Sequence, residues 1–141
     1  DILPTVAELI SAKLPKHKID GKSIVKLIKG TSNESPQEAY YFYYGKQLQA
    51  IRMGKWKLHF PHSYRTMAGK PGGKGGIPTK YSQAKIGLAL FDLDKDIGET
   101  TNVKDKYPGI VAKMQKLGES MRTELGDNGR KGGGQRKPGL L

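Results

Sequence analysis

The chain has 141 residues, and its 25 Lys and Arg against 13 Asp and Glu give a net charge of +12. The length is enough for one domain with a packed core, and the basic surplus favours a polyanionic partner, although a basic surface without a dedicated partner would have the same composition. Because it contains no cysteine, the sequence excludes disulfides, thiol nucleophiles and thiolate zinc sites, and no apolar run reaches the roughly 18 residues of a membrane span.

Residues 1–37 are predicted to form a helical lead-in to the rest of the chain. Thr5, with a glutamate three residues later, matches a capping box, and an apolar stripe at helical spacing surrounds it. The stripe consists of Ile2, Leu3, Val6, Leu9 and Ile10. It is large for so short a helix, so we expect it to pack on another part of a longer parent protein. A second short helix is expected over residues 23–29, capped by its first serine and ended by Gly30.

An antiparallel β-meander is predicted over residues 38–60, because aromatic and β-branched residues alternate with polar ones between glycine-marked turns. In the last run the large apolar side chains share one face: Trp56, Leu58 and Phe60. The opposite face carries the basic side chains of Lys55, Lys57 and His59. One face of this strand is therefore expected to pack in the core and the other to be basic.

Glycine and lysine dominate the composition of the region after the meander. Residues 61–85 are poor in large apolar side chains and contain the run GKPGGKGG, which predicts a mobile exposed loop. The run is not a P-loop, because its Gly-Lys pair is not followed by Ser or Thr. It would suit a flexible electrostatic arm, but a solvated insertion is the favoured interpretation. Residues 86–93 are apolar on both faces, as in an interior strand, and Gly98 in the turn-rich segment that follows is expected at a positive φ.

Residues 105–125 are predicted to form the main helix, with Asp105 as its cap and Pro108 in its first turn. Its apolar stripe consists of Ile110, Val111, Met114, Leu117, Met121 and Leu125. Gly118 indicates a close approach to a neighbouring element. Strands in one block with helices outside it predict an α+β fold: an antiparallel sheet of about four strands packed against the long C-terminal helix, with short N-terminal helices.

We predict no catalytic residue and no metal site within this chain. His59 and His62 are separated by a proline, which argues for a strand end, and no acidic residue lies nearby in the sequence to complete a ligand set. The acidic run that begins at Asp92 resembles a calcium loop only superficially, since glycine and glutamate do not stand at the required positions. We expect a structural turn, with Glu99 and Asn102 bonding backbone groups. No G-x-S-x-G motif supports a serine nucleophile.

Basic residues at the edge of the predicted sheet are the main candidate for binding. They are Arg52, Lys55, Lys57, His59, His62 and Arg65. Such a face can bind phosphate or sulfate through charge-assisted hydrogen bonds. Exposed aromatic residues are not interleaved with these cations, so nucleic acid is the less favoured partner.

Four motifs in order resemble the C-terminal part of a sulfatase of the arylsulfatase family: DILPT, LP-x4-DG-x-S, QAIRMGKWKLHF and LFDL-x-x-D-x-G-E-x-x-N. The resemblance covers roughly residues 1–126. It implies that residues 1–37 end the large domain of a sulfatase, that residues 38–126 form its C-terminal subdomain, and that residues 127–141 are a basic, glycine-rich tail. The subdomain in this family is a four-stranded antiparallel sheet with a long helix packed on it.

The resemblance also implies what this chain would lack. Sulfatases carry calcium and a formylglycine, made from Cys or Ser in a C/S-x-P-S/A-R motif, in a large N-terminal domain, and that motif does not occur here. The expected partners are therefore that catalytic domain and a sulfated substrate, which could be a polysaccharide, in a periplasmic or secreted protein. By analogy, the residues that help to shape the substrate pocket would be Lys57, His59, His62, Ser63 and Arg65.

Two other functions are compatible with the same residues. The chain could be a basic module that binds sulfated glycans or other polyanions, as its charge of +12 suggests. It could also be the same subdomain of a related phosphodiesterase or phosphonate hydrolase, which only the catalytic domain would distinguish.

Overall fold

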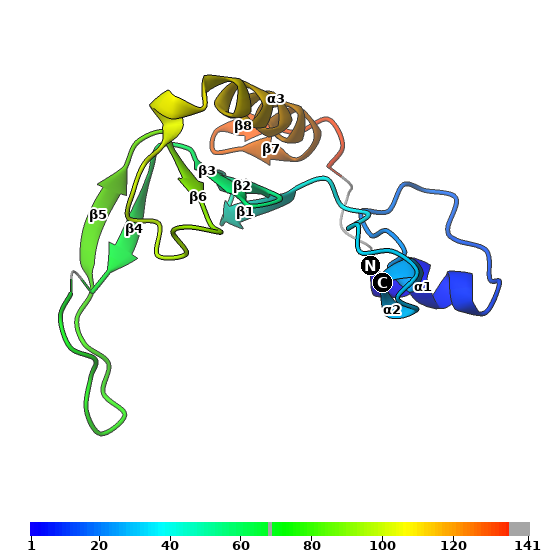
Figure 1. Ribbon diagram of the computed structural model, residues 1–141, viewed down its shortest axis with the longest axis horizontal. Coiled ribbons are helices and arrows are strands. Elements are labelled where there is room, and N and C mark those ends of the chain that lie inside the picture. The colour runs from blue at the N-terminus through cyan, green and yellow to red at the C-terminus, as the bar shows by residue number, and fades with distance from the viewer. Residues whose placement is uncertain (68, 136–141) are drawn as a thin grey trace. The chain divides into compact units, whose positions relative to one another are not determined.

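The structure is a computed structural model that describes residues 1–67 and 69–135. The chain divides into two compact units, Asp1–Glu38 and Ala39–Leu141, and each is described by itself. The first unit contains two short helices, and the second contains the sheet and the long helix (Figure 1). No helix in the described part of the chain is long and apolar enough to cross a membrane.

The first unit is built on helices α1 (Ile2–Leu9) and α2 (Val25–Ile28). The predicted capping box is wrong: the helix begins before Thr5, and the Thr5 hydroxyl instead donates to the Asp1 carbonyl and accepts a hydrogen bond from the Ile24 N–H. Thr5 therefore ties the two helices together. Gly30, at a φ of +66°, ends the second helix as predicted, because a residue without a Cβ adopts this conformation without strain.

Apolar side chains of α1 remain exposed in the first unit. The buried residues of the helix are Pro4, Thr5 and Ala7. The predicted stripe lies on the exposed side, with Ile2 81% and Ile10 68% exposed. A helix that exposes this much apolar surface is not stabilised by burial within its own unit.

The second unit contains a four-stranded antiparallel sheet in the order β1-β2-β3-β6. Its strands are β1 (Tyr40–Tyr44), β2 (Gln47–Met53), β3 (Trp56–His59) and β6 (Ala89–Asp92). Helix α3 (Pro108–Leu125) covers one face of this sheet (Figure 1). The pairing of β1 with β2 is irregular between Phe42 and Tyr43. The predicted α+β architecture is confirmed.

The core lies between the sheet and α3. Its fully buried side chains are Leu48, Ile51, Leu58, Leu90 and Met114. Each stabilises the fold by about 1.5–3 kcal/mol relative to an exposed position. At Gly118 a Cβ would lie 2.5 Å from Phe60 Cζ, so the helix approaches the sheet this closely only because the residue is glycine. The predicted contact at Gly118, and the predicted burial of Met114 against the sheet, are both confirmed.

Strand β6 is apolar on both faces although it lies at the edge of the sheet, so the prediction of an interior strand is wrong. The edge is covered by the segment that leads into the 3₁₀-helix η1 (Lys104–Lys106). The Leu90 N–H donates to Asn102 Oδ1 at 3.0 Å, and the Val103 N–H donates to the Leu90 carbonyl at 2.8 Å. These bonds replace the missing neighbouring strand, which is why β6 can be buried.

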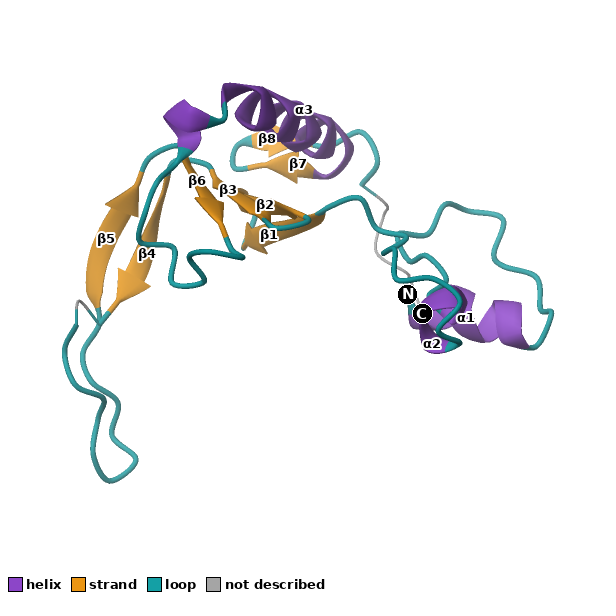
Figure 2. Ribbon diagram, viewed as in Figure 1, coloured by secondary structure: helices purple, strands orange, loops and turns teal. Residues whose placement is uncertain are grey.

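The two ends of the predicted loop 61–85 instead form a β-hairpin, with strands β4 (His62–Thr66) and β5 (Ser82–Ile86). The glycine-rich run, residues 69–76, lies between these strands and is exposed, as predicted. These strands pair only with each other among the described residues (Figure 2). The two strands were missed because the glycine-rich run between them dominates the composition of the segment. In β5 the alternation of less and more exposed residues is carried mostly by small and polar side chains, and in β4 exposure does not alternate.

The ends of α3 differ in part from the prediction. Asp105 does not cap the helix, since it lies in η1, and the helix begins at Pro108 after Tyr107, which makes no side-chain capping bond. The helix ends at Gly126, at a φ of +95°. A short pair of strands follows, β7 (Gly126–Asp127) and β8 (Arg130–Lys131), in the first part of the predicted tail. The last residues of that tail, 136–141, lie outside the described residues.

Candidate functional site

The face of the sheet opposite α3 carries a charged group of three side chains, which we call the Lys-Glu-His group: Lys57, His59 and Glu99. Lys57 and His59 alternate with Leu58 on β3, so they point away from the core. Lys57 Nζ lies 2.5 Å from Glu99 Oε1, and His59 Nε2 lies 2.6 Å from Glu99 Oε2. One carboxylate therefore holds both basic side chains of this strand in place.

The loop after β6 brings Glu99 to the group. The Asp96 carboxylate accepts hydrogen bonds from the Thr100 and Thr101 N–H groups, which fixes the turn. Glu99 itself adopts a φ of +56°, whereas Gly98 does not have a positive φ, so that prediction is wrong by one residue. A left-handed conformation is unfavourable for a residue with a side chain. The bonds of its carboxylate to β3 help to hold Glu99 in it.

The role predicted for Glu99 is wrong, because its side chain binds two side chains and not backbone groups. Local sequence carried no signal for this contact, since Glu99 is separated from Lys57 and His59 by 42 and 40 positions. The signal lies in strand pairing: β6 is antiparallel to β3, with Trp56 opposite Asp92, so the loop after Asp92 returns over β3. Asn102 is correctly predicted to bond backbone groups, as the Leu90 and Lys104 N–H groups both donate to it.

Protonation of the group follows from burial and hydrogen bonds. Burial would raise the pKa of Glu99, but hydrogen bonds from Lys57 and His59 outweigh it and lower the pKa. Burial lowers the pKa of His59, and the bond to Glu99 opposes this only in part. His59 is therefore neutral at pH 7 and donates its Nε2 hydrogen to Glu99. Its Nδ1 is then an acceptor, and it is buried without a hydrogen-bond partner among the described residues.

His62 extends the group beyond the end of β3. Its ring stacks on that of His59, with centroids 5.5 Å apart and an interplanar angle of 18°. His62 Nδ1 donates to the Phe60 carbonyl at 2.7 Å, so in the neutral ring Nε2 is left as an acceptor. Ser63 and Arg65 are also on β4, but alternation places them on the face of the hairpin opposite His62. Of the predicted pocket residues, Lys57, His59 and His62 thus come together, and Arg65 does not join them.

Other basic residues at the predicted sheet edge are held by their own partners. Lys55 Nζ lies 2.9 Å from the buried carboxylate of Asp92, and this bond lowers the pKa of Asp92. The Arg52 side chain donates to the Gly54 carbonyl. Both residues therefore contribute to the fold. Fewer cations of the predicted basic edge are then available to bind a ligand.

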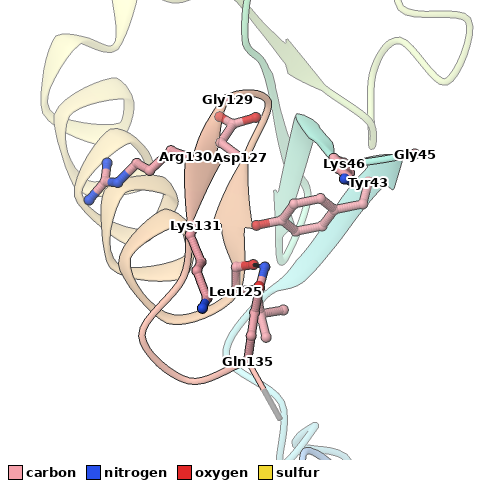
Figure 3. A pocket seen from close by; sticks show the side chains of 9 residues that line it. All are labelled: Tyr43, Gly45, Lys46, Leu125, Asp127, Gly129, Arg130, Lys131 and Gln135. Atoms are coloured by element: carbon pink, nitrogen blue, oxygen red, sulfur yellow. Dashed lines mark hydrogen bonds between the residues drawn. The ribbon is translucent and has the colours of Figure 1, made fainter. Parts of the chain in front are cut away.

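A pocket of about 410 Å³ lies between the β1–β2 turn and the β7–β8 pair (Figure 3). It is lined by Tyr43, Gly45, Lys46, Leu125, Asp127, Gly129, Arg130, Lys131 and Gln135. The Tyr43 hydroxyl donates to the Gly126 carbonyl, and Asp127 accepts from both the Leu48 N–H and Arg122. These bonds hold the end of α3 against the sheet. No predicted site residue lines this pocket.

Metal binding is not supported by the side chains present. Within residues 1–67 and 69–135, no three His, Asp or Glu side chains come together in an arrangement that could hold an ion. Lys57 and His59 occupy both oxygens of Glu99, the acidic residue beside the histidines. The Lys-Glu-His group is therefore suited to hydrogen bonding a polar or anionic ligand, and not to holding a cation.

A family model that describes the C-terminal region of aryl-sulfatase matches residues 35–131. Arylsulfatase A of Bos taurus is 35% identical over 121 residues, which are 79% of this chain and 23% of that protein. Arylsulfatase D of Homo sapiens is 30% identical over 130 residues, covering 81% of this chain and 22% of that protein. This chain thus spans less than a quarter of the length of these curated relatives.

A solved structure shows the same fold. It was described in work on the metabolism of multiple glycosaminoglycans by Bacteroides thetaiotaomicron, and it superimposes with a TM-score of 0.59 at 24% sequence identity. The match covers 87% of this chain and 24% of that chain.

Proposed function

This chain belongs to the aryl-sulfatase family, as its C-terminal region, and on that premise we propose that it lines the substrate cleft of a sulfatase and supports the catalytic domain. The chain itself would not be catalytic. The nucleophile, a formylglycine, and the calcium ion would be supplied by the N-terminal domain, since this sequence has no cysteine and no C/S-x-P-S/A-R motif. Bound in that domain, they would supply the chemistry of sulfate ester hydrolysis.

The observation that carries the proposal is the Lys-Glu-His group, whose partly buried side chains remain 14–25% exposed. Glu99 fixes Lys57 and His59 in one orientation, and His62 stacks beside them. The unpaired, buried Nδ1 of His59 is an acceptor that is unfavourable unless a donor reaches it. Because this atom is buried, a sugar hydroxyl of the substrate or a donor from the catalytic domain would satisfy it only after neighbouring side chains move. Lys57 and His62 would then position the polar groups of the substrate, and Arg65 would lie farther out along the cleft.

The proposal also accounts for the exposed apolar side chains of α1. We assign residues 1–37 to the large domain, where the exposed apolar stripe of α1 would be buried. Support comes from the exposure of Ile2, Leu3 and Leu9, which are 81%, 56% and 55% exposed in the unit described here. Burying side chains of this kind contributes about 1.5–3 kcal/mol each, so such an interface would be stable.

The test is turnover of an aryl sulfate, with 4-nitrophenyl sulfate as the probe. The parent protein should hydrolyse it, and the isolated 141-residue chain should not. In the parent, His59→Gln should raise KM more than it lowers kcat if His59 binds the substrate and takes no part in bond breaking. The matched control is His17→Gln, which removes an imidazole from the other unit. A parent with no aryl sulfate turnover would overturn the proposal.

A second candidate function is that of a related hydrolase, because the fold alone does not distinguish a sulfatase from a phosphodiesterase or phosphonate hydrolase. The parent would be a phosphodiesterase or phosphonate hydrolase if it hydrolysed bis(4-nitrophenyl) phosphate or an aryl phosphonate more efficiently than 4-nitrophenyl sulfate. Comparing kcat/KM for these probes on one preparation decides between the two.

A further inference from the structure

The β4–β5 hairpin and the glycine-rich turn between its strands have an unusual charge composition. No Asp or Glu occurs between positions 61 and 91, although the chain contains 13 acidic residues. The cations of this segment are Arg65, Lys70, Lys74, Lys80 and Lys85. A surface of one sign and without internal counter-ions attracts anions, because nothing in the segment offsets its potential.

The register of the hairpin gathers two of these cations on one face. Ser63 pairs with Lys85, and Arg65 pairs with Gln83. Directly opposed residues of an antiparallel pair point to the same side of the sheet, so these four side chains form one surface, which we call the cationic hairpin face. All four are exposed. Arg65 and Lys85 are diagonal neighbours, at a typical Cβ separation of about 7–8 Å or less, within reach of one anionic group.

These two cations differ from those of the sheet in having no acidic partner. Lys57 is bound to Glu99 and Lys55 to Asp92, so their charges are neutralised within the fold. Within the described residues, no Asp or Glu forms an ion pair with Arg65 or Lys85. Placing like charges side by side is unfavourable by itself, and an anion that binds both relieves the repulsion. Ser63 and Gln83 add a hydroxyl and an amide as hydrogen-bond donors.

We propose that the cationic hairpin face binds sulfate groups of a sulfated oligosaccharide at units beyond the ester that is hydrolysed. This rests on the proposed function and specifies its substrate class as polymeric. Sulfate is favoured over nucleic acid because the tyrosine within the two strands, Tyr64, lies on the opposite face, so β4 and β5 offer bases no tyrosine ring to stack on beside the cations. Arginine and lysine bind sulfate oxygens through charge-assisted hydrogen bonds, and saccharide hydroxyls suit Ser63 and Gln83.

The experiment measures binding of a heparin hexasaccharide to the 141-residue chain by isothermal titration calorimetry. The double variant R65Q/K85Q should bind roughly tenfold more weakly, since it loses two charge-assisted contacts. The matched control K106Q/K116Q removes the same charge from exposed positions in helical segments and should change affinity less than about twofold. The variant R65K/K85R keeps both charges and should bind within about threefold of the original chain. Amide NMR spectra verify that each variant is folded.

Four results would overturn the proposal. They are an undetectable affinity of the original chain, equal losses for the two glutamine variants, tighter binding of a dT10 oligonucleotide, and equal binding of a hyaluronan hexasaccharide, which carries carboxylates but no sulfate. The first two would show that the hairpin is not the binding surface, and the last two that sulfate is not its ligand. Turnover of 4-nitrophenyl sulfate by the parent tests the proposed function separately, so failure of one is distinguishable from failure of the other.

Discussion

The sheet and the hairpin are both antiparallel β-structures of the second unit, but their side chains act differently. In the sheet, β3 places Leu58 in the core and its basic residues against Glu99, and Lys55, just before this strand, pairs with Asp92. In the hairpin, β4 and β5 have no fully buried side chain and no carboxylate. Cations in the sheet are therefore paired with carboxylates, while Arg65 and Lys85 of the hairpin have no acidic partner among the described residues. The number of basic residues in the sequence does not show which of them have acidic partners in the fold.

The comparison predicts that truncating a large side chain costs much more stability in the sheet than in the hairpin. Leu58→Ala should lower the free energy of unfolding by about 2–5 kcal/mol, because it leaves a cavity under α3. Tyr64→Ala in the hairpin should lower it by less than about 1 kcal/mol, since this side chain is 42% exposed. Urea denaturation of both variants measures the difference, and equal losses would contradict the distinction between sheet and hairpin.

A second prediction concerns the contact between α3 and the sheet. Alanine usually stabilises a helix by about 1 kcal/mol relative to glycine. At Gly118 we expect the opposite, a loss of about 1–3 kcal/mol, because the added Cβ would meet the Phe60 ring at 2.5 Å. Gly109→Ala is the control, since nothing lies within 4 Å of a Cβ there. Thermal unfolding followed by circular dichroism would measure both, and a stabilised Gly118→Ala would contradict the close contact.

Removing the charge of Glu99 sharpens the comparison of the two sets of cations. Glu99→Gln should cost about 1–2 kcal/mol, because Lys57, whose side chain is only 18% exposed, loses its charged partner. Lys85→Gln in the hairpin should change stability by no more than about 0.5 kcal/mol. Chemical denaturation at pH 7 distinguishes them. Equal small effects would show that the Lys-Glu-His group contributes little to the fold.

The smallest expected effect is a pH dependence that arises from His59. Burial lowers the pKa of His59 in the folded chain, so the unfolded chain binds a proton more readily. Its contribution to stability is therefore complete above the unfolded pKa of about 6.5 and decreases as the pH falls below it. We expect the free energy of unfolding to fall between pH 7.5 and pH 5.5, and His59→Gln to reduce this slope. An unchanged slope, with His17→Gln as the control, would contradict the assignment.

Sequence reasoning succeeded where the signal was local periodicity. The alternation from Trp56 to Phe60 and the stripe containing Met114 gave the correct faces, because burial repeats every two residues in a strand and every three or four in a helix. It failed where tertiary contacts decided the outcome. Strand β6 appeared to be interior because Asn102 covers its edge, and the hairpin lacks the large apolar residues by which strands are recognised.

The same limit applies to the candidate site. Lys57, His59 and His62 were found because they are basic residues at the end of a predicted strand. Glu99 was assigned to a turn, since only the return of the chain after β6 places its carboxylate beside β3. The absence of Arg65 from this group could not be predicted either, because its position depends on the hairpin that the sequence did not reveal.

The two borders of the four-stranded sheet have a consequence for how this polypeptide behaves at high concentration. On one border, β6 has few unpaired N–H and C=O groups, because Asn102 and Val103 already form hydrogen bonds with the backbone of Leu90. On the other border, the irregular pairing at Phe42 and Tyr43 distorts β1. Neither border is a straight template onto which another molecule could add a strand, and this protects the aromatic-rich strand β1 from amyloid-like growth.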